Sequence, residues 1–314
     1  MSDEGEDFEM SAVSLRTWWL GARPRTLPAA LAPVAVGAGV AVPTSPHDYR
    51  SIDLLIFVLC LVVAFALQIG VNYANDYSDG VRGTDTSRVG PVRLVGQGLA
   101  PPEEVRRAAF VMFAVAAVAG LVVVLISQQW WLLIAGALAI AAAWFYTGGT
   151  RPYGYAGLGE VMVFVFFGLM AVVGTAAALT GVVTLMAVVA AIPVGLLACA
   201  LLLVNNLRDL RLDKAAGKLT LATRIGPHRT RTLYVWLVWL PFAVALVMGI
   251  TGLLVTEWPS LAALPIVTIP MAAAPARAVR NGAEGAELID VLGSTARLLL
   301  VFSLLLAVGL ALPS

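Results

Sequence analysis

Long apolar runs separated by short polar connections make up the chain from about residue 27 onward. A helix needs about 20 apolar residues to cross the hydrocarbon core of a bilayer, and hydropathy windows of similar length identify nine candidate runs. Because lipid-exposed backbone must satisfy its own hydrogen bonds, we predict an all-α membrane protein with nine transmembrane helices bundled around a central cavity. The predicted spans are Leu27–Val42, Leu54–Asn75, Val105–Ile126, Trp130–Tyr146, Gly159–Leu179, Val182–Asn205, Leu233–Leu254, Leu261–Ala276 and Val291–Leu312.

The composition supports a lipid environment. Hydrophobic residues make up 60% of the chain and charged residues only 12%, and the mean hydropathy is +0.89. These values are far from those of an ordinary soluble domain. The formal net charge of +1 gives no reason to expect a nucleic-acid partner, so the bilayer is the expected partner. Cys60 and Cys199 both lie within apolar runs, which predicts buried thiols and no disulfide.

The basic residues indicate the orientation. If the N-terminus lies in the cytoplasm, every Lys and Arg of the chain except Arg50 falls in an inner segment or at an inner helix end. The positive-inside rule therefore predicts a multi-pass protein of the cell membrane with its N-terminus inside. We expect residues 1–12, which are acidic, to form a disordered cytoplasmic tail, and residues 13–314 to form a single membrane-embedded domain. Its predicted cytoplasmic cap loops are 76–104, 147–158 and 207–232, and long loops of this kind commonly carry function.

Two Asn/Asp-rich segments follow apolar helices on this inner face. In the first, NYANDYSDGVRGTD, the side chains of Asn72, Asp76 and Asp79 fall within about 60° of one another on a helix. Gly80 and Gly83 then favour a break that lets Asp85 turn back toward them.

The second segment, NNLRDLRLDKAAGKLT, has Asn205, Asp209 and Asp213 at i, i+4 and i+8, across about 80° of one helix face. Two facing sets of amide and carboxylate oxygens suit Mg²⁺ that bridges to a phosphorylated substrate. Interleaved basic residues would bind phosphate oxygens. These are Arg82, Arg208, Lys214 and Lys218.

The two segments and three further stretches resemble the UbiA-type intramembrane prenyltransferases. The matching stretches are ARPRTLPAALAPVAVG from Ala22, NYANDYSDGVRGTD from Asn72, RVGPVRLVGQG from Arg88, YTGGTRPYGYAGLGE from Tyr146 and NNLRDLRLDKAAGKLTLATRIG from Asn205. Within the family the pattern is most similar to the branch that prenylates 1,4-dihydroxy-2-naphthoate in menaquinone synthesis. The first family motif, NxxxDxxxD, has Gly80 at its last position here, so whether Asp79 or Asp85 binds metal stays open.

The resemblance implies Mg²⁺-dependent transfer of a polyprenyl group from polyprenyl diphosphate to 1,4-dihydroxy-2-naphthoate, with loss of CO₂, to give demethylmenaquinol or demethylmenaquinone. It also implies an active site that faces the cytoplasm, with catalytic roles for Asp76, Asp79, Asp209 and Asp213. The implied metal ligands are these four residues with Asn72, Asp85 and Asn205. The implied substrate- and diphosphate-binding residues are Arg82, Tyr146, Arg151, Tyr153, Lys214, Lys218, Asn206 and Arg208.

Several of these residues also have a structural interpretation. Arg151 with Tyr146 and Tyr153 fits either a substrate site or a positively charged anchor with interfacial aromatic residues. Glu160, at the start of a span, is either a functional acid or a charge that favours a helix N-terminus. Arg23 and Arg25 lie after Trp18 and Trp19 in a segment expected to rest on the membrane surface, where one of the two arginines is also able to reach substrate.

Two other functions compete with this interpretation. A related aromatic prenyltransferase would use 4-hydroxybenzoate, homogentisate or haem as its acceptor, although the NDYSDGVRGTD and TRPYGYAGLGE segments favour the naphthoate branch. A cation-coupled transporter would use membrane acids as an ion path, but such acids usually lie near the bilayer midplane rather than at one face. The sequence does not indicate the oligomeric state.

Overall fold

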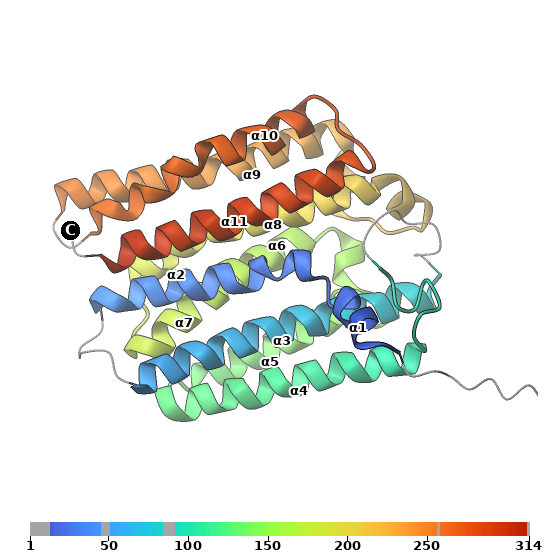
Figure 1. The fold of residues 1–314 in the computed structure, drawn as a ribbon, viewed down its shortest axis with the longest axis horizontal. Helices are drawn as coiled ribbons and strands as arrows, with labels where there is room; N and C mark the ends of the chain where they lie inside the picture. Colours follow the sequence, from blue (N-terminus) through green and yellow to red (C-terminus); the bar gives the residue numbers. More distant parts are fainter. Residues whose placement is uncertain (1–12, 45–50, 84–91, 256–257, 313–314) are drawn as a thin grey trace, which may run out of the picture.

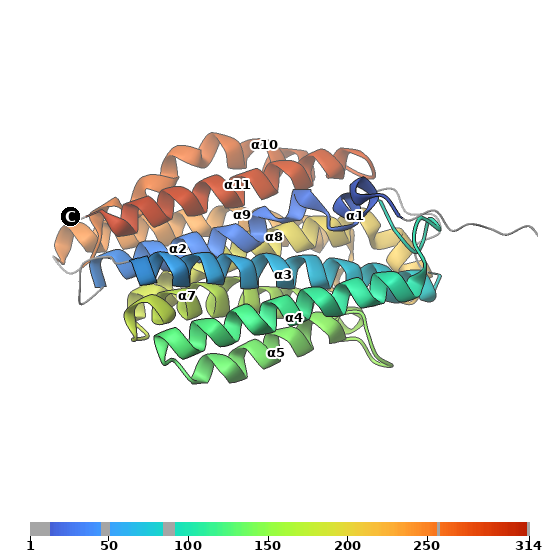
Figure 2. The ribbon, with the colours of Figure 1, turned by 60° about the horizontal axis from the view of Figure 1, so that its bottom comes forward.

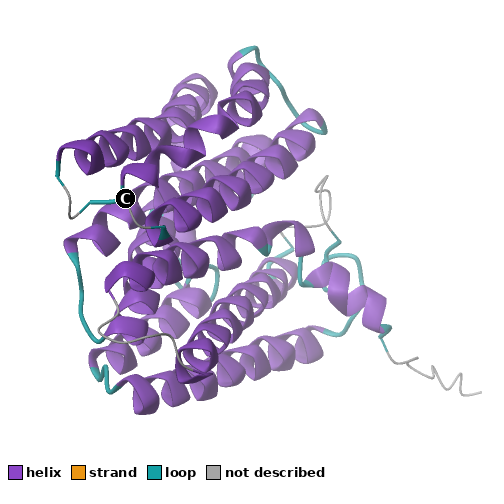
Figure 3. Ribbon diagram, turned by 60° about the vertical axis from the view of Figure 1, so that its left-hand side comes forward, coloured by secondary structure: helices purple, strands orange, loops and turns teal. Residues whose placement is uncertain are grey.

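The computed structural model describes residues 13–44, 51–83, 92–255 and 258–312, and all regular structure within these ranges is helical (Figure 3). This confirms the all-α prediction for the described residues. The elements are α1 (Leu15–Gly21), η1 (Pro24–Thr26), α2 (Pro28–Thr44), α3 (Ser51–Val81), α4 (Pro102–Ser127), α5 (Trp131–Phe145), η2 (Tyr153–Ala156), α6 (Gly159–Val163), η3 (Phe164–Met170), α7 (Ala171–Thr180), α8 (Leu185–Ala215), α9 (Leu221–Leu254), η4 (Ser260–Thr268), α10 (Ile269–Arg280) and α11 (Glu287–Ala311).

The long helices lie side by side as a bundle (Figure 1). Helix α3 packs along α4, α8 packs along α9, and α11 packs along α2. The last turns of α3 and α8 and the first turns of α4 and α9 lie at the same end of the bundle as α1, whereas the C-terminus lies at the opposite end (Figures 1 and 2). The bundle therefore brings both Asn/Asp segments to one end.

Seven of the described helices are long and apolar enough to cross a membrane, and the α1–α2 pair also qualifies as one span bent by 54°. Helix α5 is apolar but has only 15 residues. Large apolar side chains point outward, with Val118 65%, Ile134 69% and Leu253 77% exposed. In water such surfaces would promote aggregation, but a bilayer covers them. Helix α8 is the most enclosed of these candidates, with 72% of its most apolar window buried.

Three helices are longer than the hydropathy windows indicate. Helix α3 continues to Val81, so the start of the predicted loop 76–104 is helical, and α8 continues to Ala215, so the first third of the predicted loop 207–232 is helical. Helix α9 already begins at Leu221, and Gly226, with φ +79°, interrupts it before Pro227. Polar residues lower the mean hydropathy and so end the predicted span, but they do not end the helix. The preference of a residue for helix is a separate property from its hydropathy. The Asn/Asp residues are consequently held on rigid helices.

The fifth candidate span includes a close helix crossing. A Cβ atom on Gly168 of η3 would lie 2.8 Å from the Cα atom of Gly195 on α8, so only glycine allows this approach. The η3 stretch is a π-helix, and such stretches often occur at functional sites. Phe166, Phe167 and Met170 of η3 line the cavity described next.

Candidate active site

A cavity of about 850 Å³ lies inside the bundle, lined by residues of α1, η1, α2 to α8 and one turn of α11. Its polar end contains the second half of α3 and the last turns of α8, and its apolar part extends along α4, α5 and α7. Val63 and Asp79, both on α3, line the two parts and lie about 24 Å apart along the helix. The charged residues that line the polar end are Arg23, Arg25, Asp79, Arg93, Arg208, Asp209, Asp213 and Lys218. Basic residues outnumber acidic residues in this described set, which favours an anionic ligand.

The cavity-facing side of α3 differs from the predicted one. Gln68, Asn72, Asn75 and Asp79 line the cavity and lie within about 60° on the helix. Asp76 lies at the edge of this face and does not line the cavity. Its two carboxylate oxygens accept hydrogen bonds from the backbone N–H groups of Leu94 at 2.7 Å and Val95 at 3.0 Å. Asp76 therefore anchors the segment before α4. Asn72 donates to the Ala22 carbonyl at 2.9 Å.

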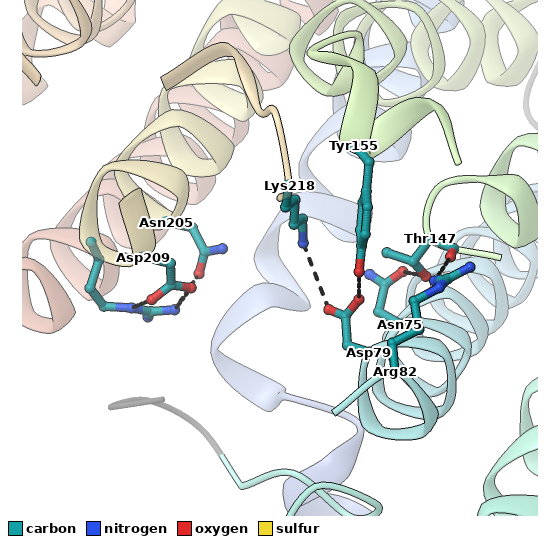
Figure 4. Close-up of polar contacts among 9 residues, drawn as sticks. Asn75, Asp79, Arg82, Thr147, Tyr155, Asn205, Asp209 and Lys218 are labelled. Carbon is teal, nitrogen blue, oxygen red and sulfur yellow. Dashed lines mark hydrogen bonds and ion pairs between the residues drawn. The ribbon is translucent and has the colours of Figure 1, made fainter. Parts of the chain in front are cut away.

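Asp79 is in contact with two residues from distant parts of the chain. The Tyr155 hydroxyl donates to Asp79 Oδ1 at 2.6 Å, and Lys218 Nζ lies 3.7 Å from Asp79 Oδ2. Figure 4 shows both side chains pointing toward this carboxylate. Asp79 is 2% exposed and Lys218 is 6% exposed. Asp85, the alternative ligand, lies outside the described residues.

The second set of oxygens lies on the predicted face of α8. Asn205, Asp209 and Asp213 all line the cavity. Arg208 makes two hydrogen bonds of 2.8 Å to the Asp209 carboxylate and a third of 2.9 Å to Asn205 Oδ1. The side chains of Arg208 and Asp209 are 4% and 3% exposed. A fully enclosed carboxylate needs a nearby cation, and the guanidinium provides it here.

Three of the predicted basic residues do not line the cavity. Arg82 donates to the carbonyl oxygens of Thr147 and Gly149, so it fastens the connection after α5 to the end of α3 (Figure 4). Lys214 and Arg151 are exposed. On a helix, Lys214 lies about 140° from Asp209 and therefore points away from the cavity.

Tyr146 and Tyr153 line the cavity with their rings edge to face, 5.5 Å apart between centroids. The Tyr153 hydroxyl donates to the Ala142 carbonyl at 2.8 Å. Burial raises the pKa of the Tyr153 phenol, so it remains neutral at physiological pH. Neutral aromatic faces of this kind attract cations.

Glu160 is buried behind the cavity wall. Its Oε1 accepts a hydrogen bond of 2.9 Å from Asn206 Nδ2, whereas its Oε2 has no hydrogen-bond partner among the described residues. The Cys199 thiol donates to the backbone carbonyl of Glu160. Asn206 itself lines the cavity, so Glu160 is adjacent to the site through that amide. Both cysteines are free thiols, as predicted.

Several residues of the site were not predicted from the sequence, among them Asn75 and Tyr155. Asn75 Oδ1 accepts a hydrogen bond from the Thr147 hydroxyl at 2.8 Å. Its spacing of four residues from Asp79 was a usable signal, because i and i+4 share a helix face. Tyr155 is part of the YTGGTRPYGYAGLGE stretch, but only the path of the connection shows that this tyrosine, rather than Tyr153, reaches Asp79.

The donor set of the cavity fits Mg²⁺. Asp79, Asn205, Asp209 and Asp213 offer hard oxygen atoms, which this ion prefers. Among the described residues no three His, Cys, Asp or Glu side chains lie close enough to form a metal cage. Mg²⁺ in phosphate-processing sites is usually held by one or two carboxylates together with substrate phosphates, so an incomplete protein cage is what this chemistry requires.

Known proteins with similar sequences cover nearly the whole chain. The 1,4-dihydroxy-2-naphthoate octaprenyltransferase of Mycobacterium tuberculosis is 48% identical over 95% of this chain and 98% of its own length. The enzyme of the same name from Haemophilus influenzae is 34% identical over 94% and 96%. The human UbiA prenyltransferase domain-containing protein 1 is 32% identical over 94% and 85%.

Solved structures share the fold. A UbiA homolog from Archaeoglobus fulgidus bound to GPP and Mg²⁺ superposes with a TM-score of 0.65 at 15% identity, over 92% of this chain and 99% of the homolog. The apo UbiA homolog from Aeropyrum pernix also gives a TM-score of 0.65, over 90% and 96%. The sequence profile of the UbiA prenyltransferase family matches residues 30–289. The resemblance seen in the Asn/Asp segments is thus confirmed, and the chain belongs to the UbiA prenyltransferase family.

Proposed function

We propose that this protein transfers a polyprenyl group from polyprenyl diphosphate to 1,4-dihydroxy-2-naphthoate, with decarboxylation, to give demethylmenaquinol for menaquinone biosynthesis. The bacterial relatives that match over most of their length carry the name of this activity. The structural observation that supports it best is the cavity, which joins a polar end rich in carboxylates and bases to a long apolar part. A substrate with a charged diphosphate head and an apolar isoprenoid tail would place its head at the polar end and its tail in the apolar part.

The proposal includes a topology of nine membrane spans with the N-terminus and the active site on the cytoplasmic face of the cell membrane. Seven long helices and the bent α1–α2 pair are candidate spans among the described residues, and the shorter α5 would be the ninth. The positive-inside rule supports the orientation, since nearly all basic residues fall at the end of the bundle that holds the site. Residues 13–314 would then form one membrane-embedded domain, preceded by the tail 1–12, which lies outside the described residues.

The residues at the polar end divide into metal ligands and diphosphate ligands. Asn72, Asp79, Asn205, Asp209 and Asp213 would hold Mg²⁺, and Arg208 and Lys218 would donate to diphosphate oxygens. Asp76 stays a predicted ligand as well, because each carboxylate oxygen has a second lone-pair site beyond its bond to a backbone amide. When bound, Mg²⁺ neutralises the charge that develops on the leaving diphosphate.

The chemistry requires a broken C–O bond and a protected cation. The electron pair of the allylic C–O bond leaves with the diphosphate, and the rings of Tyr146 and Tyr153 stabilise the allylic cation through their faces. The apolar part of the cavity holds the tail and excludes water. A ring carbon of the acceptor then forms the new C–C bond, and loss of the carboxylate as CO₂ returns its electron pair to the ring. No covalent enzyme intermediate is needed.

Purified protein with Mg²⁺ and a labelled polyprenyl diphosphate, offered each aromatic acceptor in turn, tests the proposal. We expect a prenylated and decarboxylated product with 1,4-dihydroxy-2-naphthoate alone. Prenylation of 4-hydroxybenzoate or homogentisate instead would assign the protein to another acceptor class. Absence of any transfer, together with ion flux in liposomes that Asp209→Ala abolishes, would support a transporter.

A further inference from the structure

Tyr155 contacts both Asp79 of α3 and Lys218 after α8, and the proposed function gives it no role. Its hydroxyl donates to Asp79 Oδ1 at 2.6 Å. Its ring lies beneath two cations, with Lys218 Nζ 4.9 Å and Arg82 Cζ 5.4 Å from the ring centroid. Figure 4 shows the side chain of Tyr155 between α3 and the segment that carries Lys218. One tyrosine therefore contacts the metal-binding acid of α3 and the lysine that follows α8.

The backbone around Tyr155 is held in place from two sides. The N–H of Gly154 donates to the Tyr146 carbonyl at 3.0 Å, which ties η2 to the end of α5. The carbonyl of Tyr155 accepts from the N–H of Leu219 at 3.1 Å, which ties η2 to the α8–α9 connection. On the next turn, a Cβ atom on Gly157 would lie 2.8 Å from Arg224 Nε, so this connection packs closely against α9. A functional side chain is placed accurately when its own backbone is fixed in this way.

We propose that Tyr155 is a positioning residue that sets the rotamer of Asp79 and the place of Lys218 at the same time. This inference rests on the proposed function, in which Asp79 binds Mg²⁺ and Lys218 binds the diphosphate. The phenol is a neutral donor, so it orients the carboxylate without cancelling the charge that attracts the metal. The aromatic face holds the lysine ammonium near Asp79 while the ion pair stays loose at 3.7 Å, which leaves that ammonium available to a diphosphate.

Two substitutions separate the hydroxyl from the ring. Tyr155→Phe removes the hydroxyl that donates to Asp79 and keeps the ring. We expect it to weaken binding of Mn²⁺, used as a probe for the Mg²⁺ site, by about 10-fold, the range found for residues that orient metal ligands. The KM for polyprenyl diphosphate should stay within about 2-fold of the original value, because the ring remains under Lys218. Tyr155→Leu removes the ring as well and should also raise that KM by about 10-fold.

Tyr234→Phe is a matched control. The Tyr234 hydroxyl also makes a buried 2.6 Å hydrogen bond, to Thr295 Oγ1, but it joins α9 to α11 and does not line the cavity. This substitution should lower thermal stability and leave Mn²⁺ binding unchanged. If Tyr155→Phe behaves in the same way, with wild-type Mn²⁺ affinity, Tyr155 is merely structural and the proposal is wrong. If the leucine variant does not fold, the phenylalanine variant alone decides the question.

The binding measurements use no acceptor, so they also distinguish this inference from the proposed function. Weak Mn²⁺ binding by Tyr155→Phe, in a protein that prenylates none of the acceptors, would sustain the role of Tyr155 and reject the proposed reaction. Normal Mn²⁺ binding by the same variant, in a protein that prenylates the naphthoate, would sustain the reaction and reject the role of Tyr155.

Discussion

The two Asn/Asp segments have similar sequences but lie in different surroundings. Helix α8 is enclosed, with 72% of its most apolar window buried, and its acids point into the cavity at every fourth residue. Helix α3 lies nearer the outside, with 22% buried, and one of its acids, Asp76, turns to the backbone of Leu94 and Val95. The acids of the central helix α8 face the cavity, whereas the outer helix α3 also has beside it a connecting segment whose backbone N–H groups need acceptors. Four predictions test this difference.

The largest effect is expected from removing a charged oxygen that lines the cavity. Asp79→Asn and Asp209→Asn should each lower kcat/KM by about 10³-fold, since each removes an anionic ligand worth several kcal/mol of charge stabilisation in the transition state. Steady-state rates at saturating Mg²⁺ would measure it. A loss below 10-fold at Asp79 with a full loss at Asp209 would mean that α3 contributes little to the metal site.

The second-largest effect is expected on the free energy of unfolding. Arg208→Gln leaves the Asp209 carboxylate, whose side chain is 3% exposed, without its bidentate partner, and should destabilise the protein by about 3–5 kcal/mol when no Mg²⁺ is present. Added Mg²⁺ should restore part of this stability because it supplies the missing positive charge. Thermal unfolding in detergent with and without Mg²⁺ measures both. Arg297→Gln is the control, since Arg297 is exposed and its guanidinium donates hydrogen bonds to Gly293 and Ser294 of its own helix.

Asp76→Asn tests the difference between the helices directly. Asparagine offers one acceptor oxygen, so the N–H of either Leu94 or Val95 loses its partner, at a cost of about 1–3 kcal/mol. We expect a lower unfolding temperature and a smaller loss of activity than Asp79→Asn causes. If the Mg²⁺ dependence instead changes as much as in Asp79→Asn, with normal stability, Asp76 acts as the metal ligand that the sequence pattern predicts.

The smallest effect is expected from a pair of lysines in adjacent turns. Lys218→Gln should raise the KM for polyprenyl diphosphate by about 10-fold, because Lys218 lines the cavity beside Asp79. Lys214→Gln should change it by less than about 3-fold, since the exposed Lys214 points away from the cavity. Kinetics at physiological ionic strength would show the difference most clearly, because salt screens long-range attraction. Equal effects would indicate that long-range attraction, rather than contact, explains both.

The helices themselves were predictable from the sequence, because apolar runs of membrane length leave few alternatives. The α8 half of the site was predictable for a similar reason, since residues at i, i+4 and i+8 on one straight helix must share a face. The contacts of Asp76 and Tyr155 were not predictable. Each depends on the path of an irregular connection, 92–99 for Asp76 and 147–158 for Tyr155, and no periodic pattern specifies such paths.

The division of the cavity into a polar end and an apolar part also has a consequence for the fate of the products. In the proposed reaction, polyprenyl diphosphate occupies both the polar end and the apolar part of the cavity. Its two parts end up in different products, diphosphate and the prenylated quinol, and each product suits only one of these regions. Inorganic diphosphate partitions into water and is held only at the charged end, whereas the prenylated quinol has lost its charged head and partitions into hydrocarbon. The different partitioning of the two products therefore separates them, and the associated free energy opposes the reverse reaction once the new C–C bond has formed and CO₂ has left.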